Sequence, residues 1–238
     1  MTRRWLPWLL WGLSLAFVVI GDGLQVLQAG ASGSPGFPGW AAVTLNALAF
    51  GTVGALVAYR RPTNAIGWLF LAVGVASAVQ LVTAEYATYS HDLLAGRLAG
   101  TTFIAWVSQA SVAALFAVVV PFMLLLFPDG HFASLRWRVA GQLVAVGGLS
   151  AAVAVAIKPG LMGNTEGIRN PLGVPAHGSL LLLLNVLSGL PVLLGLVLGV
   201  GSLIVRFLRS HGDQRLQLKW VMFAAACGFG AILLATVA

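Results

Sequence analysis

Long apolar stretches recur along this chain of 238 residues and leave few folds open to it. Hydrophobic residues make up 59% of the sequence and charged residues only 8%, whereas a typical soluble domain is about 25% charged. A bilayer's hydrocarbon layer is about 30 Å thick and a helix rises about 1.5 Å per residue, so one crossing needs around 20 apolar residues. The sequence therefore predicts an all-α fold, a polytopic transmembrane helical bundle.

Seven stretches are long enough to cross and make residues 1–238 one transmembrane domain. They run over about residues 5–27, 41–59, 67–83, 103–127, 139–157, 179–205 and 220–238. The first follows Arg3 and Arg4 and is longer than the apolar core of a signal peptide, which favours a retained helix. The small residues 29–31 keep cleavage open as the alternative.

The connections between these stretches differ in character. A polar loop is expected after residue 83, from Glu85 to Arg97. Pro128, Asp129 and Gly130 are residues that favour a tight turn. The longest connection, residues 158–177, is rich in Pro and Gly and should be irregular rather than helical.

The orientation follows from the Lys and Arg residues of the connections, because translocation disfavours cations in short loops. Ten of the 13 fall on one side, which predicts that this side and the N-terminus are cytoplasmic: Arg3, Arg4, Arg60, Arg61, Arg136, Arg138, Arg206, Arg209, Arg215 and Lys219. Arg97, Lys158 and Arg169 fall on the other side. Seven crossings from this start place Ala238 outside, directly after an apolar stretch, so we expect a fragment whose continuation returns through the membrane.

Small residues and prolines mark how the stretches pack. Gly195 with Gly199, and Gly51 with Ala55, are small-xxx-small pairs that allow close helix contact. Ordinary packing within the chain is the simpler interpretation and a dimerisation face the alternative. Pro121 and Pro191 each remove a backbone hydrogen bond and should kink their helices.

Two acidic residues are candidate polar sensing positions. Asp22 and Glu85 lie near the predicted outer boundary, and an ionisable residue in a membrane span is a functional hypothesis because its charge is costly in lipid. Solvated acids at the boundary are the simpler interpretation.

No motif in the sequence supports an enzyme site. The four histidines fall in different connections, on both predicted sides, and the HExxH, GxSxG, Walker A and Rossmann patterns do not occur. The single cysteine, Cys227, excludes a disulfide framework. We expect no catalytic residues, metal or cofactor, and no nucleic-acid binding despite the net charge of +7, because the cations form short clusters between apolar stretches.

Three predicted cytoplasmic connections, taken together with the outer segment Asn170-Pro171-Leu172-Gly173, resemble a known family. They are Arg60-Arg61-Pro62-Thr63-Asn64-Ala65-Ile66-Gly67-Trp68-Leu69-Phe70; Phe127-Pro128-Asp129-Gly130-His131 with Arg136-Trp137-Arg138; and Arg206-Phe207-Leu208-Arg209 with Gln214-Arg215-Leu216-Gln217-Leu218-Lys219-Trp220. The pattern is similar to the multi-span N-terminal sensor region of bacterial sensor histidine kinases. It covers about residues 59–220.

The resemblance implies a membrane-embedded input module of a two-component system in the bacterial cell membrane. The family works as a dimer, and its kinase region, absent from these 238 residues, phosphorylates a response regulator. Residues that would anchor the inner face or couple it to that region are Arg60, Arg61, Pro62, Pro128, Asp129, Gly130, Arg136, Arg138, Arg206, Arg209, Arg215 and Lys219. A small transporter, or a scaffold subunit of a membrane complex, is the alternative function.

Overall fold

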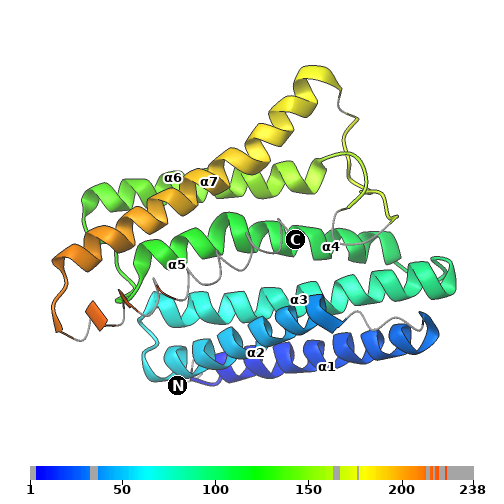
Figure 1. The fold of residues 1–238 in the computed structure, drawn as a ribbon, viewed down its shortest axis with the longest axis horizontal. Helices are drawn as coiled ribbons and strands as arrows, with labels where there is room; N and C mark the ends of the chain where they lie inside the picture. Colours follow the sequence, from blue (N-terminus) through cyan, green and yellow to red (C-terminus); the bar gives the residue numbers. More distant parts are fainter. Residues whose placement is uncertain are drawn as a thin grey trace.

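The computed structural model describes residues 4–32, 37–162, 167–175, 177–212, 215, 216, 218, 219 and 223. This part of the chain is helical, as predicted (Figure 1). In chain order the elements are α1 Leu6–Ser32, α2 Phe37–Arg60, α3 Ala65–Leu94, α4 Thr101–Ala114, the π-helical turn η2 Leu115–Val119, α5 Val120–Leu126, α6 Leu135–Ile157 and α7 Gly178–Arg209. Leu161 and Arg169 form an isolated antiparallel bridge.

Six helical segments within the described residues are long and apolar enough to cross a membrane. They are α1, α2, α3, the continuous rod α4–η2–α5, α6 and α7. Each matches one of the first six stretches expected from the sequence to within a residue or contains it. The seventh stretch, residues 220–238, lies outside the described residues apart from Phe223.

The prediction of a polar loop after residue 83 is wrong, because α3 continues to Leu94. Residues 84–94 contain polar side chains but no Gly or Pro, and polarity alone does not break a helix. The helix ends where Ala95 and Gly96 adopt positive φ, of 50° and 73°, and donate their N–H groups to the Ser90 carbonyl. A left-handed residue followed by Gly is a common helix terminus.

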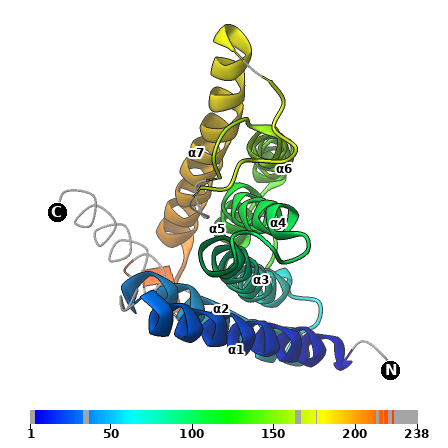
Figure 2. The same ribbon diagram turned by 90° about the vertical axis from the view of Figure 1, so that its right-hand side faces the viewer.

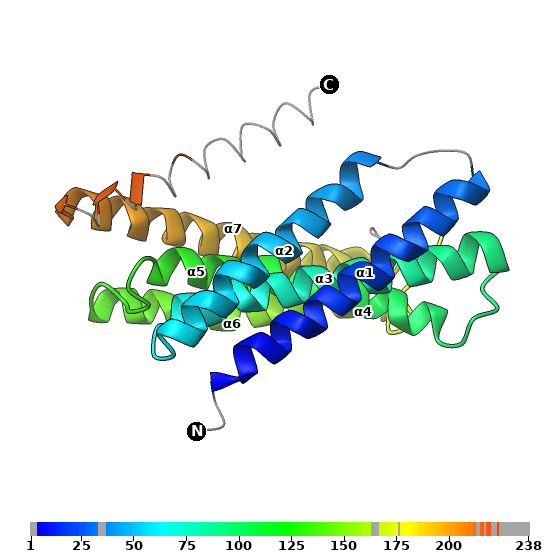
Figure 3. The same cartoon turned by 90° about the horizontal axis from the view of Figure 1, so that it is seen from below.

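The helices form a bundle with two unlike edges. Figure 2 shows α1 and α2 at one edge, α3 and the α4–α5 rod in the middle, and α6 with α7 at the other edge. Seen from below, α1 and α2 run at a slant across the remaining helices (Figure 3). The most extensive contacts join α2 to α3, α1 to α3 and α6 to α7.

Glycines bring the backbones of α2 and α3 into direct contact. A Cβ atom added at Gly54 would lie 2.2 Å from the Leu71 nitrogen, and one at Gly74 would lie 2.4 Å from the Gly51 nitrogen. Gly67 likewise faces the Ala58 backbone, at 2.6 Å. Because backbone atoms cannot move aside as a side chain can, only Gly fits at these positions.

The rod α4–η2–α5 contains a wide turn before Pro121. Pro has no N–H, so the Ala117 carbonyl loses its α-helical donor, and the chain instead closes a wider ring in which Val120 N–H bonds to the Leu115 carbonyl. The Ala117 carbonyl faces Gly148 of α6, where an added Cβ would lie 2.2 Å from its oxygen. The backbone irregularity expected at Pro121 is thus a π-helical turn. Gly148 of α6 leaves the space that the Ala117 carbonyl needs.

The packing of α7 is consistent with the simpler interpretation of Gly195 and Gly199. Both are buried, and Cβ atoms there would lie 3.2 Å from Pro121 and 2.7 Å from Leu124, which belong to α5. Figure 1 shows the yellow half of α7, the N-terminal part, rising more steeply than the orange half. Pro191 lies inside this helix and contacts Gly147 of α6.

The described part of the connection between α6 and α7 is irregular, as expected. Asn170 organises it: its amide nitrogen donates to the carbonyls of Ala156 (2.9 Å) and Lys158 (2.8 Å), where α6 ends. Met162 and Ile168 of this connection are buried against Ala87 and Ala105, in α3 and α4. The segment therefore closes the end of the bundle instead of extending away from it.

Candidate functional site

The described cations predicted for one side gather at one end of the bundle. We call it the basic end; it carries the α2–α3 and α5–α6 connections and the C-terminus of α7 (Figure 1). Arg97, Lys158 and Arg169 lie at the opposite end, next to the α3–α4 and α6–α7 connections. Each end also holds a polar cluster built from residues far apart in the sequence.

At the basic end, Arg206 joins α7 to the turn that follows α5. Its guanidinium lies 3.4 Å from the Asp129 carboxylate and donates to the Leu125 carbonyl (3.1 Å) and to the His131 carbonyl. The Arg206 side chain is only 9% exposed, whereas that of Asp129 is 51% exposed. A nearly buried cation needs such partners, so the end of α7 is held in register with residues 125–131.

The same turn contacts the start of α3. Asn64 is the N-cap of α3, and its side chain accepts a hydrogen bond from Ile66 N–H at 2.9 Å. Gly130 has φ +78°, and a Cβ there would lie 2.5 Å from the Asn64 side-chain oxygen and 2.8 Å from the Ala65 nitrogen. Both the backbone angle and the close approach therefore require Gly.

Asn64, Asp129, Gly130, His131 and Arg206 thus form one group, which we call the three-turn cluster. It unites the three connections on which the family resemblance was based. Among the other residues nominated on this side, Pro62 accepts a hydrogen bond from the Trp68 indole at 2.9 Å. Pro128 lines a cavity of about 200 Å³ beside Arg206.

The remaining nominated cations do not join the three-turn cluster. Arg60 is the last residue of α2, Arg61 follows it, and Arg136 and Arg138 lie in the first turn of α6. Beyond α7, Arg215 stacks its guanidinium over the Phe207 ring at 5.1 Å, and Lys219 is exposed. Arg209 borders a groove between α6 and α7.

At the opposite end, the two nominated acids occupy one polar cluster between α1, α2 and α3. Thr44 donates to the Asp22 carboxylate at 2.8 Å, and Gln28 donates to the Glu85 carboxylate at 3.2 Å and to its carbonyl at 3.1 Å. The Gln25 amide lies 2.7 Å from both Glu85 carboxylate oxygens, close enough for its nitrogen to donate to them. Asp22 lies one turn before Gln25 on the same face of α1, which joins it to this group. We call this group the Asp22–Glu85 cluster.

Sequence reasoning missed the partners in both clusters. Asp22, Gln25 and Gln28 recur at intervals of three, which places them on one face of a helix, and this spacing was a readable signal. Asn64 precedes an apolar run, the position of an N-cap. Nothing comparable marks His131, because it contributes a backbone carbonyl.

The two clusters are suited to mechanical and electrostatic roles. Among the described residues, no group of three or more His, Cys, Asp or Glu side chains could hold a metal ion. What the three-turn cluster can do is link the position of α7 to that of α3. What the Asp22–Glu85 cluster can do is respond to charge or hydration near two partly buried acids.

Fold and clusters define a class, a helical membrane protein with at least six helices suited to crossing the bilayer. Comparison with protein-family models, curated proteins and solved structures gives no match.

Proposed function

We propose that this chain is the membrane-embedded input module of a two-component sensor histidine kinase. The observation that carries the proposal is the three-turn cluster, in which Arg206 ties the end of α7 to residues 125–131 and Gly130 ties these residues to α3. A module that passes a signal to a downstream region needs such a junction, where a shift of one helix moves its neighbours. The family resemblance of the same connections supports this reading.

Helix α3 offers a route between the two ends. It begins at the three-turn cluster and reaches Glu85 twenty residues later, a distance of about 30 Å at 1.5 Å per residue. Under the proposal, a stimulus near the Asp22–Glu85 cluster changes the contacts of α3 with α1, and the displacement reaches Arg206 through Asn64 and Gly130. The chain beyond Arg209, which includes Arg215 and Lys219, then transmits this displacement to the downstream kinase region.

In this proposal the basic end faces the cytoplasm of a bacterial cell, and the N-terminus lies there too. Reporters fused after Arg138 and after Gly167 test this orientation. We expect them to read opposite compartments, with the first one cytoplasmic. Equal readings, or a reversed pair, would contradict the orientation.

Reading the gene beyond Ala238 is the direct test of the kinase assignment. We expect a continuation that returns to the cytoplasm and encodes a dimerisation and phosphoacceptor helix pair with an ATP-binding domain. In the full-length dimer, Arg206→Gln should change autophosphorylation and phosphotransfer to the response regulator without changing ATP affinity. A stop codon directly after Ala238, or unchanged phosphorylation, would count against the proposal.

The alternatives are a small transporter and a scaffold subunit. Proteoliposomes that contain the purified chain distinguish the first, because an input module moves no solute whereas a transporter gives saturable flux. A stoichiometric protein partner that stays bound through purification would favour the scaffold.

A further inference from the structure

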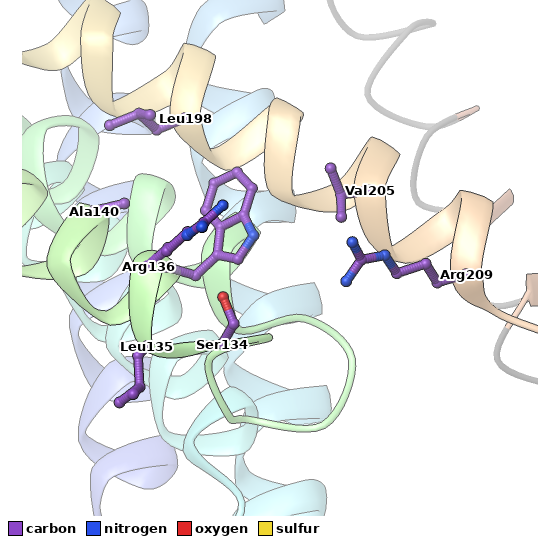
Figure 4. A pocket seen from close by; sticks show the side chains of 8 residues that line it. Ser134, Leu135, Arg136, Ala140, Leu198, Val205 and Arg209 are labelled. Atoms are coloured by element: carbon purple, nitrogen blue, oxygen red, sulfur yellow. The ribbon is translucent and has the colours of Figure 1, made fainter.

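A groove opens between α6 and α7 at the basic end, outside both polar clusters. It has a volume of about 740 Å³, within the range of about 300–1,000 Å³ typical of small-molecule sites. Arg136 and Arg209 form its opposite walls, and the Arg209 guanidinium is directed toward α6 (Figure 4). We propose that this groove binds an anionic phospholipid of the adjacent membrane leaflet.

The charge of the groove selects for an anion. None of the described residues that line it is acidic, and neither Arg136 nor Arg209 makes an ion pair with any residue that the structure describes. Arg206, one turn before Arg209, differs from these two arginines because Asp129 neutralises its charge. The first turn of α6 adds a weaker attraction, since the Ser134 side chain makes no cap hydrogen bond and the helix dipole is positive there.

The rest of the groove is apolar and runs along α6 and α7 toward the middle of these helices. Ala140, Leu198 and Val205 line it. Trp137 closes it against α7, since a Cβ on Gly201 would lie 3.7 Å from the indole. Tryptophan, like tyrosine, is enriched at the headgroup level of membranes. A soluble anion would use only the arginines, whereas a phospholipid would use both parts of the groove.

The length of the groove matches one leaflet. Leu198 lies 11 residues before Arg209 on α7, which corresponds to about 16 Å along the helix axis. Half of the hydrocarbon layer is about 15 Å thick. A phosphate held between Arg136 and Arg209 therefore places an acyl chain along Val205 and Leu198. This inference does not depend on the kinase proposal, because the groove would bind lipid in any membrane protein of this shape.

Native mass spectrometry of the purified full chain in detergent micelles tests the proposal, with phosphatidylglycerol and phosphatidylcholine of identical acyl chains as probes. Two cations near an anionic lipid should give a preference for phosphatidylglycerol of about tenfold or more. The double variant R136Q/R209Q should lose this preference. The matched variant R60Q/R61Q should keep it, because it removes the same charge from the same end outside the groove.

A third variant and a soluble probe identify the source of the anion. Leu198→Trp fills the apolar part and should lower phosphatidylglycerol retention while both arginines remain. Millimolar inorganic phosphate should not displace the lipid. The proposal is overturned by equal retention of the two lipids, by equal losses in the two arginine variants, or by displacement by phosphate. A protein dimer without bound lipid would also overturn it, since a second copy would then fill the groove.

Discussion

The two edges of the bundle are closed in different ways. At one edge α2 touches its inner neighbour α3 backbone to backbone at Gly54, Gly67 and Gly74. At the other edge α6 and α7 leave a groove of about 740 Å³ at the basic end. The contrast shows that small residues fix a helix pair only where they face backbone. Where they face side chains, the pair can separate locally and leave room for another molecule.

The largest expected effect comes from breaking the closed edge. Gly54→Ala places a Cβ against the Leu71 backbone, and we expect it to lower the stability of the folded protein by about 3 kcal/mol, at the upper end for overpacking. Thermal unfolding in detergent measures this. Gly12→Ala is the matched control, since nothing lies within 4 Å of a Cβ at that helical position. Similar melting of the two variants would refute the backbone contact.

Removing the three-turn cluster's cation should have the next largest effect. Arg206→Ala loses the Asp129 pair and two carbonyl hydrogen bonds, and we expect a loss of about 2 kcal/mol, as for hydrogen bonds to charged groups. Arg209→Ala, three residues on and exposed, should change stability by less than about 0.5 kcal/mol in detergent without anionic lipid. Chemical unfolding monitored by circular dichroism compares them, and equal losses would argue against the cluster.

The open edge predicts a smaller penalty for the same substitution. In Gly147→Ala the new Cβ would lie 3.0 Å from the Pro191 Cβ of α7, a tight contact that a shift of a few tenths of an ångström relieves, so we expect a loss of about 1 kcal/mol, at the lower end for overpacking. Gly189→Ala serves as the control because it has open space around it. If Gly147→Ala cost as much as Gly54→Ala in the same melting assay, the distinction between the edges would fail.

The smallest effect is expected in the Asp22–Glu85 cluster. Thr44→Val removes the hydroxyl that donates to Asp22, and interhelical hydrogen bonds in membrane proteins contribute about 0.6 kcal/mol on average. A small drop in melting temperature should follow. Asp22→Asn retains an oxygen that accepts from Thr44 and should change less. A drop as large as that of Arg206→Ala would mean that this cluster, rather than the glycine contact, holds the closed edge together.

The features that could be predicted from the sequence are those that depend on a single helix or turn. Apolar length located six helices, and the Pro-Asp-Gly composition located the turn at residues 128–130, because both are local properties of the chain. The end of α3 was predicted wrongly because Glu85 and His91 looked like loop residues, although no helix breaker precedes Gly96.

Pairing between helices could not be predicted from the sequence. More than 60 residues separate Asn64 from Asp129, and more than 60 separate Asp129 from Arg206. No local signal in the sequence shows that their turns meet. Glycines are visible in the sequence, but only the three-dimensional arrangement shows that Gly54 faces a backbone whereas Gly12 faces open space. The meeting of Asp22 with Glu85 likewise depends on how α1 lies across α3.

Because of the wide turn at Leu115–Val119, the two halves of the α4–η2–α5 rod direct their side chains differently around the helix axis. One additional residue in a helix rotates every later side chain by about 100°, since a turn holds about 3.6 residues. Accordingly α4 packs on α3 and α6, while α5 packs mainly on α7. A single membrane crossing thereby serves different neighbours in its two halves, which a regular helix of equal length could do only by bending.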